Sequence, residues 1–500
     1  MVEIELKFQV PPAARSRVDA AVAGRTPGRR LRLQAAYCDT PSRLLARAGI
    51  ALRVRREGRL WVQTLKRAAD DGMTRQEHNV PLGAAVLAPT VDPARHAGTP
   101  IGERLLALLA AHPGEALGVR YRTDVLRRTR VRRAAGGRVE LAFDEGRIAA
   151  VDGATPALTL CELEIELKAG SPQAVISAAR GWSARFGLWL DNRSKAERGD
   201  LLAGGATLAA PRLAKAVALF DDLSLLQMRQ QVLRSCADQV IGNASQVATG
   251  TFAAEHVHQL RIGLRRLRSA LRLFDPSPDE GVDLGEAAAR LFRELGVARD
   301  DAVIGSAFAA DLATALRSAG LPGDAPRALP TADATDPAMR VRAVACQSFL
   351  LDLLAVTTVP INARPDATGR AAADALAQRL ERWHRRAAAD SRRYDELDDA
   401  GRHRLRKRVK RLRYAVEFCA ALFPRRAVRG YLRPLRELQE RLGEINDVVM
   451  AMQAFRRGSD ADPRALFALG WLASQRDAVI AAARPELKAF VRADRFWKRR

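Results

Sequence analysis

Charged side chains alternate with apolar ones at the start of the chain and again along its first two hundred residues. In MVEIELKFQV, Glu3, Glu5 and Lys7 take every second position, and ALRVRRE, VELAFDEG and CELEIELKAG repeat this spacing. Successive side chains of a β-strand point to opposite faces, so each segment is predicted to be a strand with one charged and one apolar face. The charged positions of the later segments are Arg53, Arg55, Glu140, Asp144, Glu162, Glu164, Glu166 and Lys168.

Carboxylates on some strands and guanidiniums on others are suited to a metal and a phosphate chain. Hard divalent cations such as Mg²⁺ and Mn²⁺ prefer oxygen ligands, and arginine can hold phosphate oxygens bidentately. Phosphoryl transfer requires mainly positioning and charge neutralisation. A P-loop is excluded, because no lysine of the chain is preceded by glycine and followed by serine or threonine.

A sheet must bring these strands together. A charged strand face is usually the solvated side of a sheet, where threonine, serine and glutamine are common as well. Here several strands carry almost only charges, so we predict a closed antiparallel barrel with a polar lumen. Amphipathic stretches at residues 12–23, 101–111 and 172–186 are expected to cover its apolar outer face as helices.

These motifs, in this order, resemble the CYTH family of triphosphate tunnel metalloenzymes. Glu3, Glu5 and Lys7 match its E-x-E-x-K signature, and WVQTLKR, RTDVLRRTR, LAFDEGRI, CELEIELKAG and SKAERGDLL follow in the family's order. The resemblance covers residues 1–205. It implies an eight-stranded tunnel that hydrolyses triphosphates with Mg²⁺ or Mn²⁺.

The resemblance also implies roles for single residues, with Glu3, Glu5 and Lys7 as catalytic residues. The implied metal ligands are Glu3, Glu5, Asp144, Glu162, Glu164 and Glu166. The implied phosphate ligands are Lys7, Arg53, Arg55, Lys66, Arg75, Arg122, Arg127 and Lys195. Arg122 and Arg127 differ by an odd number of positions, so an unbroken strand would turn them to opposite faces.

Inorganic triphosphate is the substrate that we expect within this family. A thiamine triphosphatase or an adenylate cyclase of the same family is the alternative, and either would need a pocket for an organic group. The tunnel strands show no aromatic pair that obviously offers one.

After LLAGGATLAAP, which we interpret as a linker near residues 203–212, the spacing becomes helical. HQLRIGLRRLR then aligns without a gap on HRLRKRVKRLR, which indicates an internal duplication. Further along, Gly296 matches Gly443 and Asp300 matches Asp447. The matched basic residues are His258, Arg261, Arg265, Arg266 and Arg268 in the first copy and His403, Arg406, Lys410, Arg411 and Arg413 in the second.

Each copy places four of these residues, at i, i+3, i+7 and i+10, on one face of a helix. Like charges at such spacings destabilise an isolated helix by about 0.2–0.5 kcal/mol per pair, so a persistent basic stripe favours a bound anion. A solvated helix face with carboxylates nearby is the alternative interpretation. His256 has no counterpart in the second copy, and we expect it at the surface.

The paired motifs resemble the CHAD family, the conserved-histidine α-helical domain, over residues 217–500. This resemblance implies two pseudo-symmetric four-helix bundles, at about 217–345 and 346–500, around a basic surface that binds inorganic polyphosphate. The predicted fold class is therefore α+β, with a tunnel domain at 1–205 and an all-α domain at 217–500.

The composition agrees with a polyanionic partner, since 82 Lys and Arg against 57 Asp and Glu give a formal charge of +25. Aromatic residues make up only 5% of the chain, which disfavours stacking on single-stranded nucleic acid. Duplex nucleic acid remains an alternative partner, because phosphate contacts alone can bind it. A polyphosphate-binding scaffold without catalysis is the alternative to an enzyme.

Five scattered cysteines, with no metal or redox spacing, indicate buried thiols in a reducing compartment. No apolar run approaches 18 residues, so we expect a cytoplasmic protein without a membrane partner, associated with polyphosphate granules. The cysteines are Cys38, Cys161, Cys236, Cys346 and Cys419.

Overall fold

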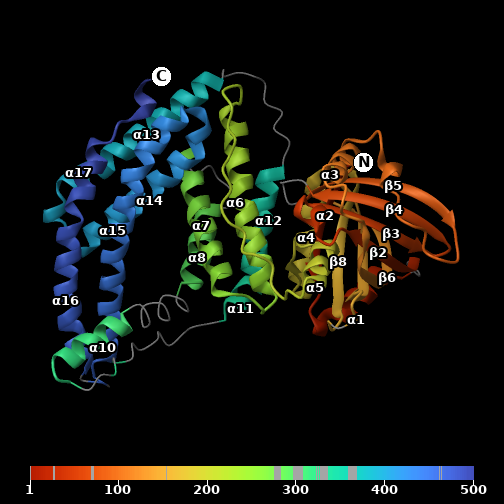
Figure 1. The fold of residues 1–500 in the computed structure, drawn as a ribbon, viewed down its shortest axis with the longest axis horizontal. Coiled ribbons are helices and arrows are strands. Elements are labelled where there is room, and N and C mark those ends of the chain that lie inside the picture. Colours follow the sequence, from red (N-terminus) through yellow and green to blue (C-terminus); the bar gives the residue numbers. More distant parts are fainter. Residues whose placement is uncertain are drawn as a thin grey trace. The chain divides into compact units, whose positions relative to one another are not determined.

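The N-terminal part of the chain forms an antiparallel β-barrel and the C-terminal part is helical (Figure 1). The computed structural model describes residues 2–25, 29–68, 73–153, 155–274, 283–296, 308–321, 324, 326, 336–358, 369–460, 462 and 464–499. The strands are β1 (Val2–Gln9), β2 (Arg29–Asp39), β3 (Ile50–Glu57), β4 (Leu60–Ala68), β5 (Thr74–Ala84), β6 (Gly118–Ala134), β7 (Gly137–Ala150), β8 (Leu158–Gly170) and β9 (Trp189–Leu190).

The sheet closes on itself through its first strand. The strand order is β5-β4-β3-β2-β6-β7-β8-β1, and β1 pairs again with β5, where Glu3 lies opposite Arg75. Eight of the strands in the described part of the chain therefore form a closed barrel, and the short β9 pairs with β1 beyond it. The predicted closed antiparallel barrel is confirmed.

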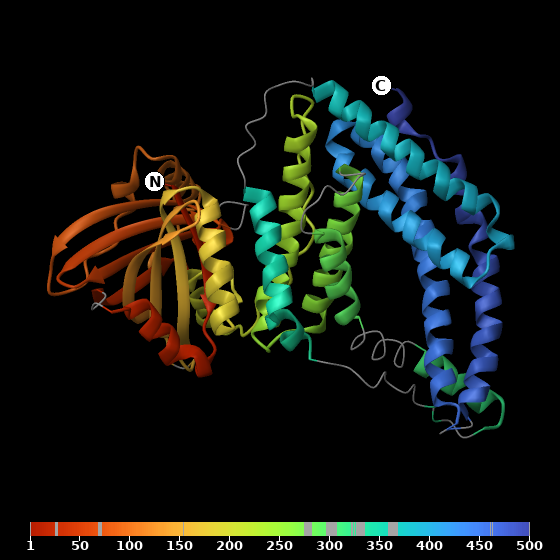
Figure 2. The same cartoon turned by 180° about the vertical axis from the view of Figure 1, so that it is seen from behind.

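The alternation of side chains decides which face of each strand points into the lumen. On β3, Leu52 and Val54 are buried on the outer face, and Arg53 and Arg55 take the lumen face. The predicted helices cover the outer face, and α4 follows one side of the barrel (Figure 2). The helical segments are η1 (Pro12–Ala14), α1 (Arg15–Ala23), α2 (Leu44–Arg47), η2 (Pro93–His96), α3 (Pro100–Ala110), α4 (Pro172–Phe186) and α5 (Lys195–Ala203).

Helix α5 covers an apolar stretch of the lumen. Ser194 and Glu197 form a capping box that begins the helix. Ala196, Leu202 and Ala203 then pack against lumen-facing residues of β2, β6, β7 and β8. The polar part of the lumen is thus bounded by a hydrophobic cluster, which comprises Leu33, Ala35, Tyr37, Tyr121, Val125, Ile148 and Leu160.

The helical part carries both predicted basic stripes, on α7 and on α14. Among the residues that the structure describes, none of the helices combines the length and the apolar character that a membrane-spanning segment requires. The helices are α6 (Leu225–Ala248), α7 (Ala254–Phe274), α8 (Leu284–Glu294), α10 (Ala309–Ser318), α11 (Pro337–Arg342), α12 (Val344–Thr358), α13 (Gly369–Arg392), η3 (Tyr394–Glu396), α14 (Asp399–Cys419), η4 (Ala420–Leu422), α15 (Arg425–Gly458), α16 (Arg464–Ala482), α17 (Arg484–Arg492) and η5 (Phe496–Arg499).

The chain divides into two compact units that do not follow the sequence order. The first unit contains Met1–Leu213 together with Ala237–Leu260 and Val341–Pro360, so parts of α6 and α7 and all of α12 belong with the barrel. The second unit contains Ala214–Cys236, Arg261–Arg340 and Ile361–Arg500. Of the five cysteines, all of them free, four are buried as expected, whereas Cys161 is only half-buried.

The predicted linker lies against the helices of the first unit. The backbone N–H of Arg212 donates to Oδ1 of Asn243 at 3.1 Å. The imidazole Nε2 of His256 is 2.9 Å from the carbonyl oxygen of Ala209. The expectation of a surface position for His256 was wrong, because the linker covers the ring and leaves only 2% of the residue exposed.

The contact between α5 and the lumen can be tested at Gly199. A Cβ atom there would lie 2.2 Å from the Tyr121 ring, so we expect Gly199→Ala to lower the thermal midpoint through overpacking that costs about 1–3 kcal/mol. Gly181→Ala on α4 is the matched control, because no neighbour lies within 4 Å of its Cβ position and alanine favours the helix. Equal midpoints in thermal melts of the two variants would contradict this account of how α5 packs.

Candidate functional site in the barrel lumen

Three buried carboxylates lie together on β7 and β8. Asp144 and Glu162 are fully buried and face each other in the strand register, and Glu164 is 8% exposed. One oxygen from each of the three lies within 4.8 Å of the others. The two-residue period of the strands produces this cluster, because it turns Glu162 and Glu164 to the same face. We call it the acid trio.

Cations from β6 and α5 neutralise the acid trio. Nζ of Lys195 lies 2.7 Å from Asp144 and 2.9 Å from Glu164, and it also contacts Glu162. The Arg127 guanidinium lies 2.6 Å from Asp144 and 2.5 Å from Glu164. Burial raises the pKa of Glu164, but the charges of Lys195 and Arg127 outweigh burial and hold this pKa well below its usual range.

The chemistry of the acid trio fits a hard divalent cation. Three carboxylates supply the oxygen ligands that Mg²⁺ and Mn²⁺ prefer, at a mutual spacing that one ion can bridge. The same trio holds the Lys195 ammonium. A metal ion and this ammonium would therefore compete for the same oxygens.

The E-x-E-x-K residues line a neighbouring part of the lumen. Glu5 contacts both Lys7 and Arg75, and Glu3 lies 2.8 Å from Nζ of Lys66. Burial raises the pKa of Glu3 to about 7, since the charge of Lys66 offsets only part of the desolvation. Burial also raises the pKa of Glu5, but the charges of Lys7, Arg75 and Lys66 together outweigh burial and lower this pKa to about 2.

Glu166, the remaining predicted metal ligand, lies opposite Glu5 in the register of β1 and β8. Nζ of Lys168 lies 2.7 Å from Glu166, and burial raises the pKa of Glu166. Lys7 joins the two groups of acids, because its ammonium contacts Glu5 and is 4.0 Å from Glu164. The six predicted metal ligands thus share one lumen in two adjoining groups.

Three half-buried arginines, Arg53, Arg55 and Arg127, face this acidic wall. Nη1 of Arg53 donates to the Tyr37 hydroxyl at 3.0 Å, and within the described part of the chain its Nε has no hydrogen-bond partner. Arg55 contacts Glu57, and its pKa is lowered by burial and then by the charges of Arg53 and Arg127. Guanidiniums that repel one another in a buried site favour an anion between them.

One predicted phosphate ligand is not brought to the lumen. Arg122 lies opposite Ala36 in the register of β2 and β6, which is the outer face, and it is exposed. Arg127, five positions further along β6, takes the lumen face. The odd spacing of the two arginines already indicated this difference.

Sequence reasoning missed two charged residues of the lumen. Glu77 contacts Lys66, and Arg198 contacts Glu162. Burial raises the pKa of Glu77, but the Lys66 charge, hydrogen bonds from Glu3 and Lys66 and the Arg53 charge together lower this pKa to about 2. The available signals were spacings, because Glu77 lies two strand positions after Arg75 and Arg198 lies one helical turn after Lys195.

An aromatic pair also escaped the sequence analysis. Tyr37 and Tyr121 lie on the lumen face of β2 and β6, and their rings stack with centroids 4.8 Å apart. Both rings are buried in the apolar cluster under α5, and they touch each other, so no further ring fits between them.

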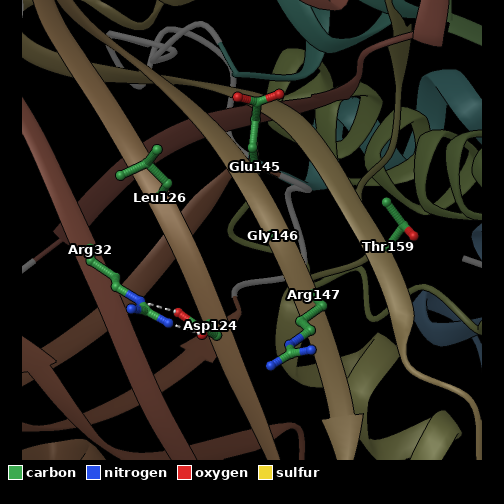
Figure 3. Close-up of a pocket in the computed structure, with 7 residues that line it drawn as sticks. All are labelled: Arg32, Asp124, Leu126, Glu145, Gly146, Arg147 and Thr159. Carbon is green, nitrogen blue, oxygen red and sulfur yellow. Dashed lines mark hydrogen bonds and ion pairs between the residues drawn. The ribbon is translucent and has the colours of Figure 1, made fainter.

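A hollow on the outer face of the same strands has a different character (Figure 3). Arg32 and Asp124 pair bidentately across its floor at 2.8 and 2.6 Å. Its charged residues lie on the side of the sheet away from the lumen, where Arg32 pairs with Asp124 and Glu145 contacts Arg15. We assign no role to this hollow.

In the second unit, charged residues from both copies of the duplicated motif lie close enough to shift one another's pKa values. Burial, followed by the charges of Arg406 and of Arg265 on α7, lowers the pKa of Lys410 on α14 to about 7. The pKa of Arg411 is lowered in the same way, to about 10, by burial and by the charges of Arg272 and Arg268. The structure thus brings the α7 and α14 stripes together as one basic cluster.

The other predicted residues of the stripes have protein partners. Arg266 is buried, and its guanidinium carbon lies 5.2 Å from the centre of the Phe418 ring, whereas Arg261 and Arg265 lie over Phe292. Nδ1 of His403 is 3.0 Å from Oδ1 of Asn446.

Arg413 donates from Nε to Gln439 at 2.6 Å. His258 is half-buried on α7, one turn before Arg261. Asp300, the predicted match of Asp447, lies outside the described residues.

Removing the Lys195 ammonium tests whether the acid trio can hold a metal. Without metal, we expect Lys195→Met to lose about 3–5 kcal/mol of stability, because three buried carboxylates lose their main counter-charge. Mn²⁺ should raise the thermal midpoint of this variant more than that of the wild type. Lys168→Met is the control, since Lys168 is half-exposed and its loss should cost less than about 1 kcal/mol. The absence of an extra Mn²⁺ effect in Lys195→Met would argue against a cation site at the trio.

Comparison with known proteins agrees with this architecture. The sequence matches the CYTH domain family over residues 1–199 and the CHAD domain family over residues 231–456. An inorganic triphosphatase from Haemophilus influenzae is 29% identical over 207 residues, which cover 40% of this chain and 54% of that protein. The chain therefore spans about half the length of this curated relative.

Two solved structures are similar to separate parts of the chain. The CHAD domain from the plant Ricinus communis is 30% identical, with a TM-score of 0.44, and the match covers 57% of this chain and 98% of that domain. HpAC1 from Hippeastrum, a putative adenylyl cyclase with a dominant triphosphatase activity, is 19% identical, with a TM-score of 0.29, over 41% of this chain and 97% of its own. The chain thus belongs to the proteins in which a CYTH domain, here at residues 1–199, is followed by a CHAD domain, here at residues 231–456.

Proposed function

We propose that the barrel hydrolyses inorganic triphosphate and short polyphosphates with Mg²⁺ or Mn²⁺, and that the helical domain binds inorganic polyphosphate. The observation that carries the first half is the lumen itself, where the guanidiniums of Arg53, Arg55 and Arg127 face the acid trio. The relative named inorganic triphosphatase aligns with this barrel and supports the choice of reaction.

The charge of each lumen residue determines the role that we propose for it. Arg53, Arg55 and Arg127 would hold phosphate oxygens, and Lys66, Arg75 and Lys195 would exchange their carboxylate partners for phosphate when substrate enters. Lys7, between Glu5 and Glu164, would stabilise the charge on the transferring phosphoryl group.

The acid trio with Glu3, Glu5 and Glu166 would hold the divalent cation, which would neutralise phosphate charge and lower the pKa of water. Hydrolysis adds one water across a phosphoanhydride bond and releases orthophosphate and a chain shorter by one phosphate. Each carboxylate freed from its lysine or arginine partner would then be available to the cation.

An inorganic substrate fits the lumen better than thiamine triphosphate or a nucleotide. Tyr37 and Tyr121, the aromatic pair of the lumen, stack on each other and leave no space between them for the ring of a ligand. The residues that pack around this pair are largely apolar and covered by α5, and both tyrosine hydroxyls already have partners, Arg53 for Tyr37 and the carbonyl oxygen of Ala196 for Tyr121.

The basic cluster of α7 and α14 supports the second half of the proposal. A half-buried lysine whose pKa is about 7, and which arginines surround, is stabilised in its charged form when an anion neutralises its neighbours. Polyphosphate supplies about one negative charge per residue and needs no aromatic platform. We further propose the two pseudo-symmetric four-helix bundles and the division into domains at 1–205 and 217–500.

Glu5→Gln tests the division of roles. We expect the variant to lose metal-dependent phosphate release from tripolyphosphate and to keep its affinity for long-chain polyphosphate, because Glu5 lies in the lumen and not in the basic cluster. Phosphate release with Mg²⁺ or Mn²⁺ and a binding titration measure the two properties. ATP and thiamine triphosphate are run beside tripolyphosphate, and preference for either would reassign the substrate.

The same assay separates the enzyme from a scaffold. A wild type that binds tripolyphosphate but releases no phosphate with either metal would make the barrel a binding site only. Equal loss of turnover and of long-chain binding in Glu5→Gln would contradict separate sites. Competition between polyphosphate and duplex DNA at one ionic strength tests the partner of the helical domain.

Polyphosphate affinity should depend on pH through Lys410. Its pKa of about 7 means that the ammonium loses its proton as the pH rises through neutrality, and a bound polyanion favours the protonated form. Affinity should therefore rise as the pH falls from about 9 to about 6, by no more than about tenfold per unit for one linked proton. Lys410→Arg keeps its charge over this range, so its profile should be flatter. Parallel profiles for wild type and Lys410→Arg would exclude Lys410 as the linked group.

A further inference from the structure

A row of buried polar side chains on α6 and α12 contacts the loop that precedes α5. Ser245 and Gln246 lie on α6 and Gln347 on α12, each at most 2% exposed. These residues belong to the same compact unit as the barrel. Buried polar groups need hydrogen-bond partners, and each of the three has one in the segment 190–193, while the amide groups of Gln246 and Gln347 also donate to the carbonyl oxygens of Thr251 and Val341.

The contacts to this segment are specific. Oε1 of Gln347 accepts from the backbone N–H of Leu190 at 2.7 Å, and Oγ of Ser245 accepts from that of Asn192 at 3.1 Å. Oε1 of Gln246 accepts from Nη1 of Arg193 at 2.8 Å.

The other side of the segment is bonded to β1. Arg193 pairs bidentately with the fully buried Asp191 at 2.8 and 2.7 Å. The backbone N–H of Asp191 donates to the carbonyl oxygen of Lys7 at 2.9 Å, and Nε2 of Gln9 donates to its carboxylate at 3.1 Å. The loop is thus held between the catalytic strand and α6.

The position of this loop decides where Lys195 lies. Two residues after Arg193, Lys195 begins α5, and its ammonium reaches all three carboxylates of the acid trio. A displacement of the loop of about 1 Å would displace this ammonium equally, and such misplacements commonly cost on the order of a hundredfold in rate.

We infer that Gln246 of the helical domain is a positioning residue for the barrel, because through Arg193 and Asp191 it fixes Lys195 at the acid trio. This inference rests on the proposed hydrolysis for its kinetic readout. The helical domain then contributes to turnover of short substrates that never touch its basic cluster.

Gln239 provides a matched control on the same helix. It is likewise a fully buried glutamine of α6, but its side chain donates to Oε1 of Gln259 at 2.9 Å and not to the loop. Gln239→Leu and Gln246→Leu both remove a buried amide, so any general loss of stability should be similar.

The experiment compares these two variants and Gln246→Glu with the wild type in the full-length chain. We expect Gln246→Leu to lower kcat for tripolyphosphate on the order of tenfold with a smaller change in KM. Gln246→Glu should restore most of the rate, because its carboxylate still accepts from Arg193. Gln239→Leu should leave kcat within about twofold, although its thermal midpoint falls as far.

Hydrogen exchange provides a readout that does not depend on activity. The amides of residues 190–198 should exchange faster in Gln246→Leu than in Gln239→Leu. Equal exchange in the two variants, or an equal loss of kcat, would overturn the inference. A wild type without turnover would overturn the proposed hydrolysis, and the exchange data would then decide the positioning role alone.

Discussion

Charged groups buried inside a closed barrel must be neutralised by one another or by a ligand, and the arrangement of the first two hundred residues depends on this constraint. An isolated ionised side chain is very costly to bury. In the lumen, opposite charges neutralise one another. Glu3, Glu5 and Lys7 share one face of β1 and lie beside opposite charges from β5 and β8. Lys195 completes the neutralisation from outside the sheet, which explains why the barrel needs α5.

The barrel lumen and the basic cluster of the helical part respond differently to the free-energy cost of burying charged groups. In the lumen, the cations Lys195 and Arg127 hold Glu164 ionised, and the carboxylates of the acid trio hold Lys195 protonated. In the α7 and α14 cluster, burial and like charges act in the same direction, and the pKa of Lys410 falls to about 7. A paired lumen accepts a cation and an anion together. A cluster of basic groups that repel one another accepts an anion alone, which suits a polymer of phosphate.

The strand pattern was enough to predict which residues face the lumen, because a two-residue period has only two phases. Glu162 and Glu164 could be placed together on this ground, and Arg122 could be separated from Arg127. The pattern says nothing of which charges meet across the barrel. Glu77 and Arg198 were missed because their partners lie on other elements, and Tyr37 and Tyr121 stack although 84 positions separate them. His256 was misplaced because the linker, and not its own helix, covers it.

The buried polar residues of α6 show why apolar packing alone would not fix the position of the segment 190–193. Apolar contacts resist separation of two surfaces, but they tolerate sliding by fractions of an ångström, since dispersion and the hydrophobic effect have little direction. Hydrogen bonds lose strength steeply with angle and distance. Three such bonds at 2.7 to 3.1 Å to the segment 190–193 define its position where apolar residues would only cover it. Lys195 must contact three carboxylates at once, so the position of the segment that precedes it must be accurate. This accuracy outweighs the free-energy cost of burying glutamine and serine side chains.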